Sequence, residues 1–432
     1  MKDIFKKIIA KLLELEARAI IKKYQPRIIA VTGSVGKTST KDAIYAVLSS
    51  AVYARKSEKS FNSDIGVPLT ILGCNNAWTN PLKWLQNLGH GLNLILFRQS
   101  YPEWLVLEVG ADRPNDIKDI TRWLKPDVVV VTKFAAVPVH IEYFKSKDEV
   151  VAEKGHLVAA LKHDGILILN SDDTDVFAFK NKTPNRVLTY GLFGDAEVRA
   201  TNYSLYYQEK NANEPYGIYF KVEYAGNCLP VRLIGTLGQN NIYSSLAALA
   251  VGISLKLNLV GAVESLSRYQ TPRGRMSLIK GLKRSTLIDD TYNSSPVALT
   301  SALQTLAEIK TKNRRIAVLG DMLELGKHTV EEHKKAGQLA ATACDILLTV
   351  GLRARGLAES AIDEGLDEDS VLQFDNSNEA GEYLKTIIKE GDIILVKGSQ
   401  STRMERVVKA VLAEPARAAD LLVRQEPEWL AR

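Results

Sequence analysis

A short loop near the start of the chain combines glycines, a lysine and a threonine in the order that phosphate-binding sites use. The loop reads TGSVGKT over residues 32–38, between an apolar run at residues 27–31 and a segment with helical spacing at residues 37–49. Where a strand runs into a helix in this way, successive backbone N–H groups and the helix N-terminus can surround phosphate oxygens. The segment therefore predicts a nucleotide phosphate site.

Each residue type in this loop has a chemical reason to be there. Gly33 and Gly36 let the backbone approach a phosphate, Lys37 would neutralise phosphate oxygens, and the hydroxyl of the next residue would reach Mg²⁺. Val31 stands where the full Walker pattern has glycine, so the loop is a shortened variant. An ordinary glycine turn is the alternative, but the strand, the GKT triplet and the helix together favour phosphate binding. The predicted ATP contacts here are Gly33, Ser34, Val35, Gly36, Lys37, Thr38 and Ser39.

A carboxylate at the end of a later apolar run is placed to help bind a metal. Glu108 follows the apolar residues 104–107, and open α/β sheets bind ligands at the carboxyl ends of their strands. Mg²⁺ prefers oxygen ligands of this kind beside phosphates. Taken alone, Glu108 fits a solvated strand end equally well. The loop itself would serve a switch, a motor or a kinase as well as a ligase.

The elements that would position these residues alternate between strand and helix, which indicates a largely parallel sheet. Between Ala196 and Leu237 apolar residues alternate instead, which predicts a small antiparallel excursion. A second strand and helix pattern starts at Ser285. The predicted fold class is α/β: a P-loop parallel-sheet ATPase domain with this excursion, followed by a Rossmann-like C-terminal α/β domain. The expected strands are residues 27–31, 105–109, 127–132, 165–169, 286–289, 315–319, 346–350 and 392–396.

We expect three segments along the chain. Residues 1–25 form a basic amphipathic helix, residues 26–282 a central ATP-binding domain and residues 283–432 a C-terminal domain, with the boundary near 280–284. Packing of the helix on the following domain is the favoured interpretation, and contact with a membrane surface is the alternative. The apolar side chains that can share one face of this helix are Phe5, Ile8, Ile9, Leu12, Leu13 and Ile20.

The composition excludes several classes of protein. The chain has 432 residues with a formal net charge of +6, and 46% of its residues are hydrophobic, which is typical of a globular protein. The basic residues form no aromatic-rich cluster, so nucleic acid is not an expected partner.

Three distant cysteines indicate neither a disulfide framework nor a zinc site, which favours a cytoplasmic protein. Charged residues interrupt the first 24 residues, so they are neither a signal peptide nor a spanning helix. In residues 78–104, prolines and glycines break an apolar stretch, which predicts a packed insertion.

Several further motifs occur in one order along residues 28–411. Besides the loop at 32–38, they are FNSDIGVPLT at 61–70, EVGA at 108–111, NSDD at 170–173, DDTYNSSP at 289–296, GDMLELG at 320–326 and VKGS at 396–399. Together these motifs resemble the Mur ligase family. GDMLELG and VKGS single out the branch that adds D-alanyl-D-alanine to UDP-N-acetylmuramoyl-tripeptide.

The resemblance implies an ATP-dependent amide ligase of cell-wall synthesis. In this family the γ-phosphate passes to a substrate carboxylate, and an amine then attacks the acyl phosphate, with release of ADP and phosphate. The resemblance makes Lys37, Glu108, His140 and Lys154 catalytic. Thr38 and Glu108 would bind a first Mg²⁺, and His140 with a carbamylated Lys154 would bind a second. By residue type alone, His140 and Lys154 fit ordinary surface or core positions.

The same resemblance assigns the remaining contacts. Asn241 would contact adenine, and Arg275, Asp290, Tyr292 and Asn293 would face the nucleotide, although Tyr292 and Asn293 also fit a turn before proline. The substrate contacts would be Asn62, Lys397 and Ser399.

Some features depart from the family pattern. The family carries a UDP-sugar-binding domain ahead of the phosphate loop, and we expect that domain to be missing here. Lys133 replaces the family's asparagine, and Asn240 replaces its histidine. Three interpretations stay open: the ligase named above, a Mur-type ligase for a non-UDP or lipid-linked carboxylate, and a non-catalytic nucleotide-binding subunit. The expected partners are the nucleotide-sugar peptide, D-alanyl-D-alanine, a protein that supplies UDP binding, and the inner membrane face through residues 1–24.

Overall fold

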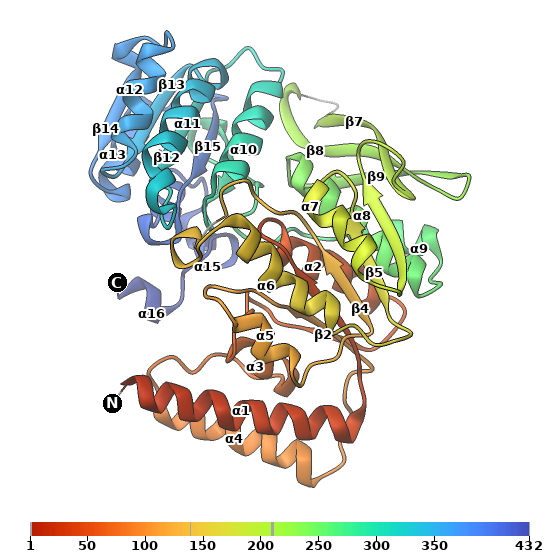
Figure 1. Cartoon of the computed structure of the whole chain (residues 1–432). Helices are drawn as coiled ribbons and strands as arrows, with labels where there is room; N and C mark the ends of the chain where they lie inside the picture. Colours follow the sequence, from red (N-terminus) through yellow and green to blue (C-terminus); the bar gives the residue numbers. More distant parts are fainter. Residues whose placement is uncertain (1, 139, 209–210, 432) are drawn as a thin grey trace.

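The computed structural model of the chain describes residues 2–138, 140–208 and 211–431, and it contains two sheets (Figure 1). Met1, which belongs to the predicted first helix, lies outside the described residues, as does the side chain of Phe5. No helix in the described ranges is both long enough and apolar enough to cross a bilayer.

The first sheet has nine strands in the order β2-β3-β1-β4-β5-β6-β7-β8-β9. Strands β1 to β6 are parallel, β7 joins β6 in parallel, and β8 and β9 continue as antiparallel strands. The predicted parallel sheet with its antiparallel excursion is confirmed. The strands are β1 Arg27–Thr32, β2 Ala54–Lys56, β3 Trp104–Glu108, β4 Val128–Val131, β5 Ile166–Asn170, β6 Arg186–Gly191, β7 Val198–Gln208, β8 Asn211–Tyr224 and β9 Asn227–Ile234.

The parallel strands are continuous apolar runs because helices cover both faces of the sheet. Alternate residues of β1 enter different clusters: Ile29 and Val31 pack with α2 and α8, whereas Ile28 and Ala30 pack with α1 and α3. The helices of this part are α1 Lys2–Tyr24, α2 Lys37–Ser49, α3 Gly66–Leu72, α4 Pro81–Leu96, α5 Asp116–Thr121, α6 Lys147–Ala159, α7 Thr174–Phe177, α8 Gln239–Ser254 and α9 Leu259–Ser267.

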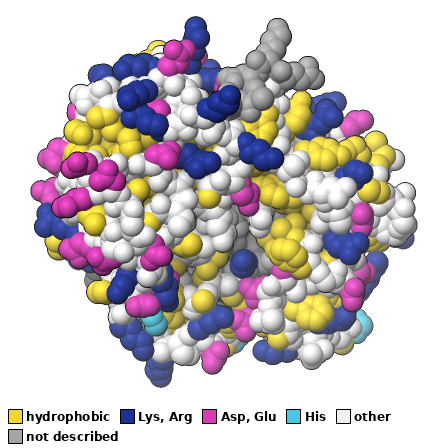
Figure 2. All heavy atoms as spheres, turned by 90° about the horizontal axis from the view of Figure 1, so that it is seen from above, with side chains coloured by type: hydrophobic (Ala, Val, Ile, Leu, Met, Phe, Trp, Pro, Cys, Tyr) yellow, Lys and Arg dark blue, Asp and Glu magenta, His cyan; other side chains and the backbone are white. Residues whose placement is uncertain are grey.

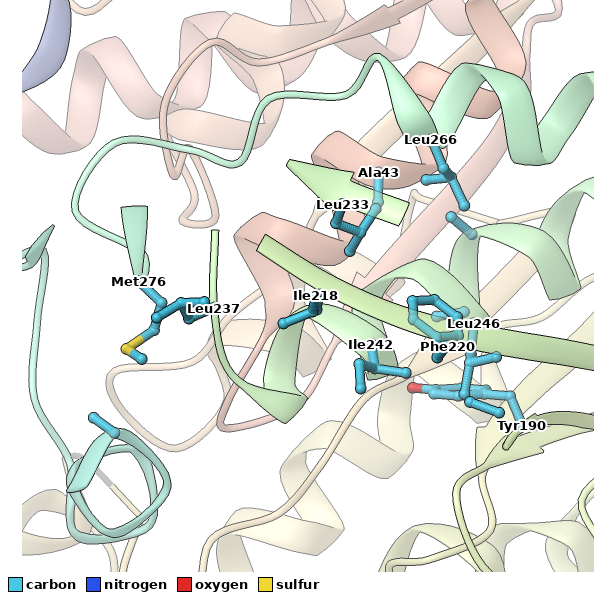
Figure 3. Close-up of a cluster of buried hydrophobic side chains, with 14 of the residues drawn as sticks. Ala43, Tyr190, Ile218, Phe220, Leu233, Leu237, Ile242, Leu246, Leu266 and Met276 are labelled. Atoms are coloured by element: carbon cyan, nitrogen blue, oxygen red, sulfur yellow. The ribbon is translucent and has the colours of Figure 1, made fainter. Parts of the chain in front are cut away.

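The cluster beneath the antiparallel strands closes the core of this sheet. Figure 3 shows Ile242 and Leu246 of α8 close to Ile218 and Phe220 of β8, and all four side chains are buried. Tyr190 of β6 is also fully buried in this cluster, and its hydroxyl donates to the carbonyl oxygen of Val131 at 3.3 Å. The excursion is therefore a cover over α8 rather than a separate body.

The second sheet has six strands in the order β10-β11-β15-β12-β13-β14, and only its edge strand β10 is antiparallel. This is the expected Rossmann-like layer, while the 280–284 boundary stays a prediction. The strands are β10 Ser277–Lys280, β11 Thr286–Asp290, β12 Arg315–Gly320, β13 Ile346–Val350, β14 Val371–Phe374 and β15 Ile393–Lys397. The helices are α10 Pro296–Glu308, α11 Thr329–Ala343, α12 Arg355–Asp363, α13 Ser377–Ile387, α14 Glu405–Ala410, α15 Ala418–Leu421 and α16 Pro427–Leu430.

Two expectations about the apolar segments need correction. Residues 78–104 are not broken by their glycines, because α4 runs without interruption from Pro81 to Leu96. In α1, Ile9, Leu13 and Ile20 are buried, but Ile8 and Leu12 are exposed and do not share their face. Buried and exposed apolar residues follow one another directly along the sequence of α1, so the sequence pattern grouped both faces of the helix as one. The α1 helix packs on α3 and α4, as the favoured interpretation expected.

Candidate functional site

The glycine loop has the backbone of a phosphate site. Gly33 has φ 142° and Gly36 has φ 85°, values that L side chains rarely adopt. A side chain at Gly33 would also collide with the Thr132 hydroxyl at the end of β4. The Ser34 amide donates to the Lys133 carbonyl oxygen at 2.7 Å, which fixes the loop against the same strand end. The N-terminus of α2 follows directly, with its first amides facing the loop.

Lys37 carries a half-buried charge that the protein only partly compensates. Its Nζ donates to the Gly33 carbonyl oxygen at 2.9 Å. Burial lowers the pKa of Lys37, and the nearby Glu108 carboxylate partly opposes that shift. An ammonium group in this position gains from an anionic ligand, because burial has removed most of its water.

The proposed metal ligands Thr38 and Glu108 are brought together by a serine that the sequence reasoning missed. Ser60 Oγ lies 3.0 Å from Thr38 Oγ1 and donates to Glu108 Oε1 at 2.6 Å. Asn62 Nδ2 lies 3.4 Å from the same carboxylate oxygen. Glu108 Oε2 is buried and has no hydrogen-bond partner in the described chain. This orphaned oxygen, with two hydroxyls beside it, fits the oxygen-ligand set of Mg²⁺.

His140 and Lys154 occupy two different surroundings. His140 Nδ1 lies 2.9 Å from Glu324 and its Nε2 lies 3.3 Å from Asp112. Lys154 is buried on α6, and burial together with the charge of Lys37 lowers its pKa to about 7. The described residues contain no group of three or more His, Cys, Asp or Glu side chains arranged to hold a metal. The pairing of His140 with Lys154 at a second metal ion stays a prediction.

Asn241 is buried at the start of α8, with its amide nitrogen already engaged. Nδ2 donates to Thr236 Oγ1 and to the Leu237 carbonyl oxygen, both at 2.8 Å. The contact of Asn241 with adenine stays a prediction. Lys133 and Asn240, which depart from the family pattern, line a small hollow beside Gly36.

In the second sheet, Lys397 is paired inside the protein. Its Nζ lies 2.6 Å from Asp290 Oδ2 and donates to the Asn293 carbonyl oxygen at 2.9 Å. Ser399 Oγ accepts from the Leu323 amide at 2.9 Å, which joins the VKGS and GDMLELG motifs. These residues form a second group, distinct in its contacts from the Thr38 and Glu108 group.

Arg275 connects the two groups. Its guanidinium lies 4.1 Å from the centre of the Tyr292 ring, its charge lowers the pKa of Lys37, and its buried Nε has no partner within the described residues. Behind Tyr292, Arg424 donates to the Tyr292 carbonyl oxygen at 3.0 Å and also to that of Thr291. No sequence signal pointed to Arg424, because it lies in a C-terminal segment without a motif.

Comparison with known proteins finds two family models that match this chain. The Mur ligase middle domain matches residues 31–252, and the Mur ligase glutamate ligase domain matches residues 274–400. The chain is 28% identical to the UDP-N-acetylmuramoyl-tripeptide--D-alanyl-D-alanine ligase of Bacillus subtilis (strain 168), over 93% of this chain and 79% of that protein. The protein of the same name from Escherichia coli (strain K12) is 29% identical over 92% of this chain and 79% of its own length.

A solved structure shares the fold. The MurF ligase from Thermotoga maritima in complex with ADP superimposes with a TM-score of 0.74 at 24% identity, covering 93% of this chain and 83% of that one. The first family match alone spans more than half of the residues, and it includes the glycine loop, Glu108, His140 and Lys154. The chain belongs to the Mur ligase family of ATP-dependent amide ligases.

Proposed function

We propose that this chain joins D-alanyl-D-alanine to UDP-N-acetylmuramoyl-tripeptide at the expense of ATP. The observation that carries the proposal is the similarity to two ligases of that name over more than nine-tenths of the chain. The motifs GDMLELG and VKGS, which suggested this branch, lie in direct contact through Ser399 and Leu323. Their contact supports a joint role beside the incoming amine.

Lys37 and the loop amides would hold the phosphates of ATP. Among the described residues, the half-buried Lys37 ammonium has no carboxylate within hydrogen-bond distance, so a phosphate oxygen would complete its surroundings. Thr38, Glu108 and the added Ser60 would hold Mg²⁺, which would supply positive charge beside the phosphate oxygens. Glu108 Oε2 supports this role because it is buried beside the loop without a hydrogen-bond partner in the part of the chain that the structure describes.

Lys154 would act as a carbamate toward a second Mg²⁺, together with His140. A neutral amine adds to CO₂ with loss of one proton, and a pKa of about 7 leaves much of Lys154 neutral near physiological pH. The product is an anionic oxygen ligand, which a lysine otherwise cannot offer. His140 would have to leave Glu324 or Asp112 to become a ligand.

The second sheet would complete the site from the other side. Arg275, which lies near Lys37 and over Tyr292, is placed to contact transferred phosphate. Lys397 is held by the Asp290 carboxylate and the Asn293 carbonyl oxygen. We therefore propose that Lys397 has two roles: it shapes this strand end, and it contacts the substrate. Closure of two such groups around the acyl phosphate would exclude water from it.

The test is ADP release by the full chain with Mg-ATP, the UDP-tripeptide and D-alanyl-D-alanine, with each substrate omitted in turn. We expect release to need both substrates and mass spectrometry to find the pentapeptide product. A parallel reaction with a muramoyl-tripeptide that lacks UDP distinguishes the alternative acceptor. Turnover only in that reaction would transfer the proposal to a ligase for a non-UDP carboxylate. ATP binding without release in either would favour a non-catalytic subunit.

A further inference from the structure

The α1 and α4 helices lie side by side at the edge of the molecule, below the central sheet in Figure 1. Lys23 Nζ at the end of α1 donates to the carbonyl oxygens of Leu94 and Phe97 at the end of α4, both at 2.8 Å. Glu16 lies against Gly91 in the middle of the pair. The two helices therefore run in the same direction in a fixed register.

The α4 helix has an exposed apolar stripe in addition to its buried side. Trp84, Gly91 and Leu94 are buried. The stripe follows positions i, i+3, i+7, i+10 and i+14, which place residues on one face of a helix. Its side chains are 50 to 72% exposed at Leu82, Leu85, Leu92 and Leu96, with Gly89 between them.

The α1 helix adds a parallel stripe. Ile8, Leu12 and Leu15 are 41 to 52% exposed, although Ile9 and Leu13 beside them are buried. We call the two stripes the α1–α4 apolar face: Ile8, Leu12, Leu15, Leu82, Leu85, Leu92, Leu96 and the adjoining Phe97. Isolated exposed leucines are normal on protein surfaces, but ordered rows of them on two packed helices are not.

The charge of this helix pair is one-sided. The α1 helix has seven Lys or Arg against three Asp or Glu, and residues 81–98 have Lys83 and Arg98 with no acidic residue. The pair thus has a net charge of +6, equal to that of the whole chain. The opposite face of the molecule, seen in Figure 2, intersperses basic, acidic and apolar side chains instead.

We propose that the α1–α4 apolar face binds the surface of an anionic lipid bilayer, with both helices lying in the plane of the interface. Protruding leucines enter the boundary between headgroups and acyl chains, while the exposed Lys7 and Lys22 meet the negative headgroups. A fluid bilayer accepts side chains of any shape, whereas a protein partner would need a matching groove. A second copy of the chain would bring an equal positive charge against this face, so self-association is disfavoured.

The experiment is flotation of the full chain with vesicles. One set is pure phosphatidylcholine, and the other contains about 30% phosphatidylglycerol, a level that gives a negative surface potential. We expect binding to the anionic vesicles, little binding to the neutral ones, and release as the salt concentration rises.

Two pairs of variants separate the apolar and ionic contributions. Leu85→Gln with Leu92→Gln removes apolar contact, and Lys7→Glu with Lys22→Glu reverses charge; each should weaken binding by about tenfold or more. The matched controls are Leu352→Gln and Lys385→Glu, which change exposed side chains in the part of the chain that forms the second sheet. Both control variants should bind vesicles as the unaltered chain does. Because all these side chains are exposed, the variants should keep the far-UV circular dichroism and the ligase activity of the parent.

Three results would overturn the proposal. The first is absence of binding to either vesicle, and the second is binding that the Leu85 and Leu92 changes leave intact. The third is a lipid-free dimer, detected by light scattering, that the same changes dissociate; the face would then join two copies. If the unaltered chain bound anionic vesicles but showed no ligase activity, this result would contradict only the proposed reaction.

Discussion

The two ends of the parallel strands in the nine-stranded sheet differ in how their charges are satisfied. At the amino ends, a groove of about 850 Å³ includes Arg27, Trp104 and Asp127 in its lining. Asp127 accepts from the Ile28 amide at 2.8 Å and pairs with Lys162 at 2.8 Å, while Arg27 stacks over Trp104. At this end the Asp127 carboxylate and the Arg27 guanidinium both have partners within the protein.

The carboxyl ends show the reverse. The hollow beside the glycine loop measures only about 10 Å³, yet among the described residues Glu108 Oε2 is buried without a hydrogen-bond partner and Lys37 Nζ donates to one carbonyl oxygen. Uncompensated charge costs folding free energy, and a ligand of opposite charge recovers that cost on binding. Unpaired charge, rather than the size of a hollow, therefore marks the end of this sheet at which we propose that the reaction takes place.

The most severe test removes the charge from the carboxyl end. Lys37→Ala should lower turnover by a factor on the order of 10³ or more, because phosphoryl transfer relies on positioned positive charge. The melting temperature should not fall, since the lost ammonium group was poorly compensated. Lys256→Ala, in the lining of the amino-end groove, is the control and should leave ADP release unchanged. Equal activity in the two variants would remove the distinction between the ends.

Two glutamates at opposite ends of β3 give a matched pair. Glu108→Gln should reduce kcat by about 10²-fold and raise the Mg²⁺ concentration needed for half activity, because an amide is a weaker ligand than a carboxylate. Glu103→Gln, just before the same strand, should change neither quantity. Titration of ADP release with Mg²⁺ checks both variants. Identical Mg²⁺ curves would show that Glu108 is only a strand end.

Lys154 tests whether a carbamate forms at the carboxyl ends of the strands. Lys154→Ala should lose activity by about 10²-fold and regain part of it with acetate or formate, which replace the carbamate oxygens. After CO₂ is stripped from the unaltered chain, bicarbonate should restore activity faster at pH 8 than at pH 6, because the amine with a pKa of about 7 is neutral above that pH. Lys147→Ala, on the same helix, is the control. Failure of both rescues would leave Lys154 as a structural lysine.

The parallel strands and the glycine loop could be predicted because both are local: each apolar run and the GKT triplet carry their own signal. Short edge strands such as β2 and β14 were missed, since pairing partners rather than their own residues define them. Ser60 and Glu324 lie beside the predicted ligands only after distant segments meet. The pairing of Lys397 with Asp290, across two parallel strands, is likewise a product of register that no single-sequence pattern contains.

At the amino end, changes should affect stability and leave catalysis intact. Asp127→Asn weakens the bond from the Ile28 amide and the ion pair with Lys162, and should lower the free energy of unfolding by about 1–2 kcal/mol. Asp164→Asn, which lines the same groove at an exposed position, should cost little. Urea denaturation and ADP release measure the two effects separately. A loss of kcat in Asp127→Asn at unchanged stability would mean that the groove contributes to the reaction.

The smallest effect is expected at Glu16, the buried carboxylate between α1 and α4. Like Glu108, Glu16 has one carboxylate oxygen without a hydrogen-bond partner in the described residues, but no cation site is proposed beside it. Its Oε2 has no hydrogen bond within the described residues, and burial raises the pKa to about 7. The folded state therefore favours the protonated form, so the contribution of Glu16 to stability falls as the pH rises from the carboxyl's unfolded pKa of about 4.3 toward 7. Glu16→Gln should stabilise the chain by about 1–2 kcal/mol at pH 8 and by almost nothing at pH 4. Glu14→Gln, on the exposed side of the same helix, should give no such pH-dependent gain in urea denaturation. If both variants gave the same gain at both pH values, the unpaired carboxylate of Glu16 would be solvated, and the contrast between satisfied and unsatisfied charge would hold only at the carboxyl ends.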